Sequence, residues 1–283
     1  MSADMISDSP IEVSTVALAM RTSVMRIAVL ITCYNRVETT LRCLGRLKTA
    51  AAEIPEAKFD VWLVDDASPD QTGAKVKVAF PEVHVIQSPG NLFWCKGMRL
   101  AWDSAGKSGA EYDFYLWLND DAMLKPDALV GVLKDCENGG GVIVGRMSSD
   151  ESEREESFGM QGDKGDWMNG NLVLVPQTVY EKIGPICGDY HHGYGDHDYG
   201  LMAKRAGFPL RASTSFCGVC PQQPERYHWL GDHSLLGRLK LLGDPKGYNM
   251  HDAVLFRYRN WGVVMAVACV LHMTIRAVLN TGR

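Results

Sequence analysis

Four runs of mainly apolar residues, each ending in polar side chains, dominate the first part of the chain. Continuous apolar character of this kind is typical of strands buried on both faces of a parallel sheet. The segments between the runs place apolar residues at helical spacing, and proline or glycine marks several of their ends. The sequence therefore predicts four strands, with a helix after each of them. The predicted strands are residues 26–35, 59–68, 83–91 and 112–121.

This alternation predicts an α/β fold with a mostly parallel central sheet flanked by helices. Ligands of such sheets bind at the carboxyl ends of the strands. A polar cluster stands at that end of every predicted strand. Four clusters at the same edge indicate a binding site rather than chance. The clusters are residues 32–35, 65–66, 88–91 and 119–121.

The fourth predicted strand ends in two adjacent carboxylates, Asp120 and Asp121. Like charges at this spacing repel each other, and removing them from water is costly. Either the strand surfaces there in a solvated turn, or the site holds a cation. Carboxylate oxygens suit a hard divalent metal such as Mn²⁺ or Mg²⁺. Because an apolar strand delivers the pair to the ligand-binding edge, we favour the metal.

The pattern changes after Arg146, where an acidic run that reads as a loop is followed by one strand and short helices. The chain is mostly helical from about residue 229. Its apolar stretch, residues 261–275, is flanked by arginines and interrupted by His272, which is short for a membrane span. It fits a helix at a membrane surface, in a core or at a homo-oligomer interface. The expected layout is an extension (1–25), a main domain (26–228) and a helical C-terminal appendage (229–283).

Composition narrows the function classes. The 283 residues are 46% hydrophobic and 22% charged, as in an ordinary globular enzyme. A net charge of −5 argues against a nucleic-acid partner, because no basic field attracts phosphate backbones. Eight scattered cysteines and an N-terminus without a signal pattern predict a cytoplasmic protein. Cys217 and Cys220 form a CxxC pair, which we interpret as buried thiols rather than a zinc or redox site.

No dinucleotide or phosphate-loop glycine motif follows the first predicted strand. Instead, six segments in order resemble the family-two inverting glycosyltransferases, which have a GT-A fold and use nucleotide-diphosphate sugars. The resemblance covers about residues 26–228 and is closest to rhamnosyltransferase-like members. It implies a nucleotide-binding half (26–125) and an acceptor half (126–228). The segments are VLITCYNR, VWLVDDASPDQT, NLFWCKGMRLA, YLWLNDDAMLKPDAL, GNLVLVPQTVYEKIG and GYGDHDYGLMAKRAG.

The resemblance assigns a role to each matching residue of the nucleotide half. Thr32 and Tyr34 match positions that contact and stack on the base. Asp66 matches an acid that accepts a hydrogen bond from a pyrimidine N3–H, which implies a UDP- or dTDP-sugar donor. Asn91 and Gly97 match a nucleotide loop, although the larger residues between them depart from its pattern.

The same resemblance covers the metal and the catalytic base. Asp120 and Asp121 match the last two places of a DxD motif whose first place holds an asparagine. It gives Asp121 to the metal, and Asp120 to the ribose or to a water on the metal. Asp196 matches the base that takes the proton of the acceptor hydroxyl. His228 is the candidate for a further metal ligand.

The expected function is therefore a metal-dependent inverting transfer of a sugar to a hydroxyl of a glycan or lipid-linked glycan in cell-surface polysaccharide synthesis. A lipid-linked acceptor would explain a peripheral position on the cytoplasmic face of the inner membrane, through the C-terminal helix. Two alternatives stay open at this point. A sugar nucleotidyltransferase also uses acids and a metal, and a non-catalytic nucleotide-sugar binding module would keep Asp66 and Asp121 without using Asp196.

Overall fold

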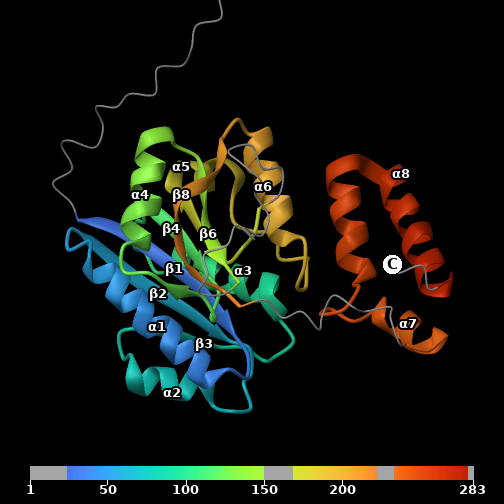
Figure 1. The fold of residues 1–283 in the computed structure, drawn as a ribbon, viewed down its shortest axis with the longest axis horizontal. Helices are drawn as coiled ribbons and strands as arrows, with labels where there is room; N and C mark the ends of the chain where they lie inside the picture. Colours follow the sequence, from blue (N-terminus) through green and yellow to red (C-terminus); the bar gives the residue numbers. More distant parts are fainter. Residues whose placement is uncertain (1–23, 150–167, 222–232, 280–283) are drawn as a thin grey trace, which may run out of the picture.

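The computed structural model describes residues 24–149, 168–221 and 233–279. Its first half has the expected alternation of strands and helices (Figure 1). Strands β3, β2, β1 and β4 lie side by side in that order, and every pairing among them is parallel. The elements are β1 (Met25–Cys33), α1 (Val37–Ala52), β2 (Ala57–Asp65), α2 (Thr72–Ala79), β3 (His84–Gln87), α3 (Phe93–Lys107) and β4 (Phe114–Leu118).

The second half extends the same sheet with mixed directions. Strand β7 is antiparallel to both β4 and β6, whereas β6 and β8 pair in parallel. The full order is β3-β2-β1-β4-β7-β6-β8-β5, so the four strands of the predicted nucleotide half form an all-parallel group at one side of the sheet. The elements are β5 (Met123–Leu124), α4 (Ala128–Gly139), β6 (Val142–Ser148), β7 (Leu172–Pro176), α5 (Gln177–Ile183), α6 (Gly195–Arg205) and β8 (Leu210–Val219).

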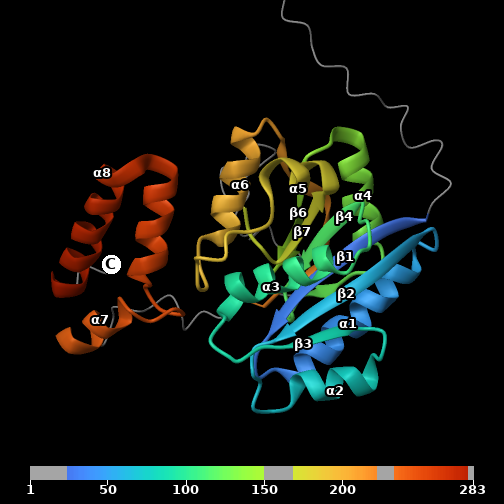
Figure 2. The same ribbon diagram turned by 180° about the vertical axis from the view of Figure 1, so that it is seen from behind.

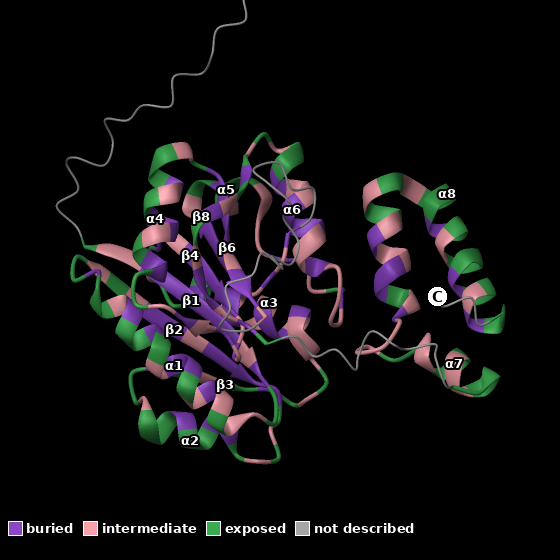
Figure 3. Ribbon diagram, in the orientation of Figure 1, coloured by how far each residue is buried: buried purple, intermediate pink, exposed green. Residues whose placement is uncertain are grey.

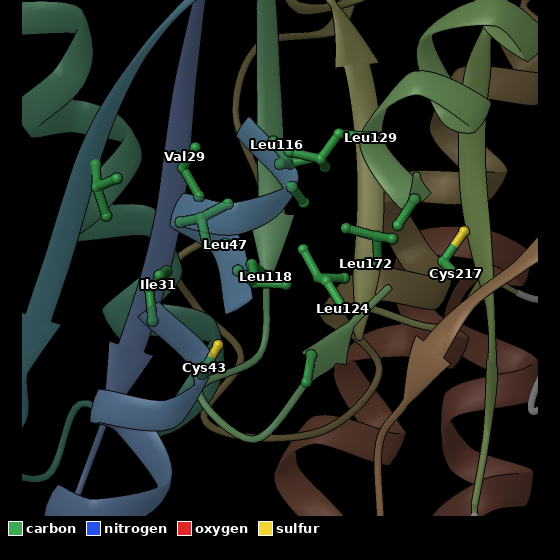
Figure 4. Close-up of a cluster of buried hydrophobic side chains, with 14 of the residues drawn as sticks. Val29, Ile31, Cys43, Leu47, Leu116, Leu118, Leu124, Leu129, Leu172 and Cys217 are labelled. Carbon is green, nitrogen blue, oxygen red and sulfur yellow. The ribbon is translucent and has the colours of Figure 1, made fainter. Parts of the chain in front are cut away.

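Helices cover both faces of the sheet, as Figures 1 and 2 show. Alternate residues of β1 point to opposite faces, so Val29 and Ile31 pack with α1, α2 and α4. Leu30 packs on the other face with α3, α5 and α6. Strands β1, β4, β6 and β7 are accordingly buried along most of their length (Figure 3). Figure 4 shows the first of these cores, where Leu47 of α1 lies among the strand side chains. Burying each such side chain contributes about 1.5–3 kcal/mol.

The C-terminal region consists of α7 (Leu235–Leu241) and α8 (Met250–Leu279). Gly262 has a φ of 81° and divides α8 into two arms, which Figure 1 shows folded back on each other. Side chains of the second arm are largely exposed, among them Val264 at 75% and Leu271 at 59%. By length and composition α8 is able to cross a membrane, with a mean hydropathy of 2.0 over 18 residues. This arm is therefore a large apolar surface without cover in the described part of the chain.

Three sequence predictions lie outside the described residues, and one of them is the acidic run expected to be a loop, most of which falls in residues 150–167. Most of the expected N-terminal extension falls in residues 1–23, and the candidate metal ligand His228 falls in residues 222–232. The predicted helical character of the C-terminal region is confirmed for residues 235–241 and 250–279.

Candidate functional site

A cavity of about 590 Å³ opens at the carboxyl ends of β1, β2 and β4, where the polar clusters were expected to meet. Five of the six predicted nucleotide-binding residues line it. They are Thr32, Tyr34, Asp66, Asn91 and Asp120. This size falls in the range of small-molecule and cofactor sites. The parallel sheet thus brings together residues that are separated by up to 88 positions in the sequence.

The two acids that follow β2 have different positions. Asp65 accepts hydrogen bonds from the backbone N–H groups of Ser68 and Gly73, so it holds the turn that leads into α2. Asp66 lines the cavity and accepts from the Leu92 and Phe93 amides, each at 3.0 Å. These bonds fix its carboxylate in the cavity wall. Asp66 is therefore held rigidly at the end of the cavity that is expected to bind the nucleobase.

Gly97, the sixth predicted nucleotide-binding residue, does not line the cavity. It is buried in α3, where a Cβ atom would overlap the side chain of Thr32. The glycine therefore lets α3 approach the end of β1 closely. Its position explains the residue type by packing, and it places Thr32 in the cavity wall.

The adjacent acids have a cation in the structure, and it comes from the chain itself. The Nη1 atom of Arg36 lies 3.1 Å from Asp120 and 2.6 Å from Asp121. Burial raises the pKa of Asp120 to about 7, with the charge of Arg36 opposing this shift and the charge of Asp121 adding to it. The guanidinium between the two carboxylates explains how the acid pair is tolerated in the folded protein. No sequence pattern indicated this role of Arg36.

Asn119, which precedes the acid pair, organises the neighbouring part of the cavity wall. Its side-chain oxygen accepts a 2.8 Å hydrogen bond from Nε1 of Trp94, which also lines the cavity. Its amide nitrogen donates to Asn171 at 2.7 Å. Asn119 therefore connects the carboxyl end of β4 with α3 and with the segment that leads into β7.

Asp196, the predicted base, lies in the first turn of α6 beside this wall. Its carboxylate accepts a 3.1 Å hydrogen bond from the Gly170 backbone. A Cβ atom at Gly170 would overlap the Trp94 ring and lie 3.6 Å from the Asp196 Cβ, so the glycine allows the three residues to meet. Asp196 does not line the cavity, and its side chain is 21% exposed. It lies beside Trp94, which lines the cavity.

The C-terminal region contributes to the same site. Lys246 lines the cavity, with its Nζ 5.1 Å from the centre of the Tyr34 ring. Fully buried Asp252 of α8 accepts hydrogen bonds from the backbone N–H groups of residues 191, 192 and 193. His192 of that loop also lines the cavity. Sequence analysis assigned none of these residues to the site, because no local pattern connects the tail with the strand ends.

Asp198 joins α6 to α8. It is buried, and it accepts hydrogen bonds from Nε of Arg259 at 2.9 Å and from Nδ2 of Asn260 at 2.8 Å. The first arm of α8 is therefore bonded to α6 through Asp198 and to the loop before α6 through Asp252. These bonds hold α8 against α6, the helix that carries Asp196.

The cysteines fit the reading as thiols. All eight are free, and both members of the CxxC pair are buried. Cys220 donates a hydrogen bond to Asp121 at 3.3 Å, so this thiol supports the acid pair.

The carboxylate oxygens of Asp120 and Asp121 suit a divalent metal. Two carboxylates from neighbouring residues present hard oxygen ligands, and one of them lines the cavity. Burial disfavours the charge of Asp120, which a nearby cation would stabilise. The residues present therefore fit Mn²⁺ or Mg²⁺.

Comparison with known proteins agrees with this geometry. The sequence model described as "Glycosyl transferase family 2" matches residues 28–193. Over 127 residues the chain is 34% identical to the undecaprenyl-phosphate mannosyltransferase of Micrococcus luteus. That match covers 43% of this chain and 49% of the relative, so the chain spans about half of the relative's length.

Solved structures share the fold at low identity. The mannosyltransferase PcManGT of Pyrobaculum calidifontis, in complex with GDP-Man and Mn²⁺, has a TM-score of 0.59 and 16% identity, over 92% of this chain and 80% of that one. TarS 1-349 of S. aureus, in complex with UDP-GlcNAc, has a TM-score of 0.56 and 13% identity, over 90% and 82%.

These findings confirm the expected GT-A fold and the class of enzyme, a nucleotide-sugar-dependent glycosyltransferase. They favour a glycosyltransferase over the alternatives of a sugar nucleotidyltransferase and a non-catalytic module, because the family match covers more than half of the chain. With its strand-end cavity and its matching motifs in order, the chain belongs to glycosyltransferase family 2.

Proposed function

We propose that this enzyme is a metal-dependent inverting glycosyltransferase, which moves a hexose or deoxyhexose from a UDP- or dTDP-sugar to a hydroxyl of a glycan or lipid-linked glycan. The observation that carries the proposal is the arrangement around the cavity. The residues expected to contact the nucleobase line one cavity together with Asp120, and Asp196 lies beside Trp94 of the same cavity wall.

The nucleotide occupies the side formed by β1 and β2. Thr32 and Tyr34 contact the base there, and Asp66 accepts the N3–H of uracil or thymine. Its carboxylate is held by backbone amides and a serine hydroxyl, so it is oriented before the donor arrives. Lys246 and Arg36 supply the positive charge that a diphosphate requires in this cavity.

Asp120 and Asp121 would hold the divalent metal, which when bound supplies positive charge that stabilises the leaving diphosphate. Asn119 keeps the acids at the strand end through its bonds to Trp94 and Asn171. These bonds to α3 and to the start of β7 make the end of β4 a fixed support.

Asp196 acts as the general base. As the acceptor oxygen bonds to the anomeric carbon, the bond from that carbon to the diphosphate oxygen breaks, and the hydroxyl proton passes to the carboxylate of Asp196. The bond from the Gly170 amide orients this carboxylate next to Trp94. Displacement from the side opposite the diphosphate inverts the configuration at that carbon.

The acceptor proposal rests on α8 and on the relative from Micrococcus luteus. That relative is named for transfer to undecaprenyl phosphate. The exposed apolar arm of α8 would rest on the cytoplasmic face of a membrane, where a lipid-linked glycan is presented. The same helix holds the loop before Asp196 through Asp252, which links α8 to the segment that carries the proposed catalytic base.

Substitution of Asp196 tests the catalytic assignment. We expect Asp196→Asn to lower sugar transfer by about 100- to 10,000-fold, as measured by release of nucleoside diphosphate from UDP- and dTDP-hexoses with a lipid-linked glycan acceptor. Nucleotide binding should stay within about twofold, since Asp196 lies outside the nucleotide side of the cavity. Asp103→Asn is the matched control, because that acid pairs with Arg99 on α3. Wild-type turnover in Asp196→Asn would refute the role of this residue.

A further inference from the structure

Arg36 belongs to the cavity and to the acid pair at the same time. It lines the cavity wall, and one of its nitrogens contacts both Asp120 and Asp121. Its side chain is 29% exposed, so it is reachable from the cavity. It is placed by the turn between β1 and α1, where its own backbone N–H donates to Thr72. The Arg36 guanidinium thus contacts the carboxylate oxygens of Asp120 and Asp121 that a divalent cation at this site would need as ligands.

The charges show what happens when a metal enters alone. With both acids ionised, two negative charges and one guanidinium leave one negative charge at the site. A divalent cation added without other change leaves one positive charge, and it stands within a few ångströms of the guanidinium. Charges of the same sign at that distance repel strongly where water is partly excluded. Metal binding therefore competes with the Arg36 ion pairs.

A nucleotide-sugar donor changes the balance, because its diphosphate brings two negative charges into the same cavity. With metal and donor together, the net charge returns to that of the free site. The diphosphate also offers oxygens that match a guanidinium, which binds phosphate through paired hydrogen bonds. Arg36 consequently has a second partner within the cavity that it already lines.

We propose that Arg36 is an internal counter-ion that the metal must displace, and that it transfers from the acid pair to the diphosphate when metal and donor bind together. The acid pair is then never left unpaired, and tight metal binding is restricted to the enzyme that holds a donor. This deepens the proposed function and rests on it for the divalent metal and the diphosphate.

Binding of Mn²⁺ to the purified protein tests this without any measurement of sugar transfer. Free Mn²⁺ is followed by electron paramagnetic resonance for the wild type, Arg36→Met and Arg36→Gln, each with and without UDP or dTDP. We expect both variants to bind Mn²⁺ alone at least about tenfold more tightly than the wild type, since the competing positive charge is gone. In the wild type, the nucleotide should tighten Mn²⁺ binding by about tenfold or more, and this gain should shrink in both variants.

Arg42→Met is the matched control, because it removes the same charge from the exposed face of α1. It should bind Mn²⁺ as the wild type does. Equal Mn²⁺ affinities for the wild type and both Arg36 variants, measured without nucleotide, would overturn the displacement model. If the wild type binds no Mn²⁺ even with nucleotide, the metal part of the proposed function fails. The two failures are thus distinguished by the nucleotide-containing samples.

Discussion

At the scale of single residues, the site is built from groups that oppose stable folding. Asp120 is buried beside a second carboxylate. Arg36 donates a hydrogen bond to one of its oxygens, and Thr40 donates to the other. Burial raises the pKa of Asp120 to about 7, so between about pH 4 and pH 7 the folded protein binds this proton more readily than the unfolded chain does. Such a cost is common where a site must receive a cation.

Neutralising Asp120 should therefore stabilise the metal-free protein. A carboxyl whose folded pKa is raised binds protons more tightly when folded, so its effect on stability becomes less favourable as pH rises from about 4 to about 7. We expect Asp120→Asn to raise the free energy of unfolding by about 1–3 kcal/mol at pH 8, and by less at pH 5. Arg36 keeps Asp121 as its partner in this variant.

Urea unfolding at the two pH values measures the difference. Glu38→Gln, on the first turn of α1, is a control for general loss of an acid. A variant that is less stable than the wild type at both pH values would show that the Asp120 carboxylate is not destabilising.

At the scale of elements, α8 has two arms with different surroundings. The first arm is bonded to α6 and to the loop before it, through Asp252, Arg259 and Asn260. The second arm exposes valine, leucine and isoleucine side chains. Gly262 separates the two arms, with a backbone conformation that favours glycine. One arm thus contacts the candidate site, and the other leaves apolar side chains exposed.

Vesicle flotation tests the second arm. We expect the wild type to float with vesicles that contain phosphatidylglycerol, because apolar side chains insert while neighbouring arginines meet the anionic headgroups. Val264→Glu combined with Leu271→Glu should weaken this binding at least about tenfold, since both side chains are exposed and the change leaves the core intact.

Val78→Glu is the matched control, because Val78 is 85% exposed on α2. A wild type that stays with the unbound fraction, or a double variant that floats as well, would contradict the membrane assignment. If a second copy covers this arm instead, the wild type would be a dimer in solution that the same two substitutions dissociate.

At the scale of the whole molecule, the sequence predicted what local patterns determine. The apolar runs located β1 to β4, because strands buried on both faces are mainly apolar, as the centres of β1 and β4 are. The strand ends then located Thr32, Asp66 and Asp120 in one cavity, since parallel strands bring their carboxyl ends to one edge. The sequence analysis assigned no strand to β6 or β8. Their residues alternate with arginine, serine and glycine, which hides the apolar pattern.

Contacts between distant segments could not be predicted in this way. Arg36 meets acids that lie 84 and 85 residues later, and Lys246 reaches Tyr34 from the other end of the chain. Periodicity reports which face of an element is buried, but it does not report which charged residue will face it. The role of Asp252 was missed for the same reason, because its partners are backbone N–H groups of a loop.

The central claim is that the strand-end cavity binds a pyrimidine nucleoside diphosphate together with a divalent metal. The most direct measurement is thermal unfolding with UDP, dTDP, GDP and ADP, each with and without Mn²⁺ or Mg²⁺. At about 100 times its dissociation constant a ligand adds roughly 2.7 kcal/mol of stability. The account requires stabilisation by UDP or dTDP that depends on metal. Stabilisation by a purine nucleotide without metal, or by no nucleotide at all, would contradict it.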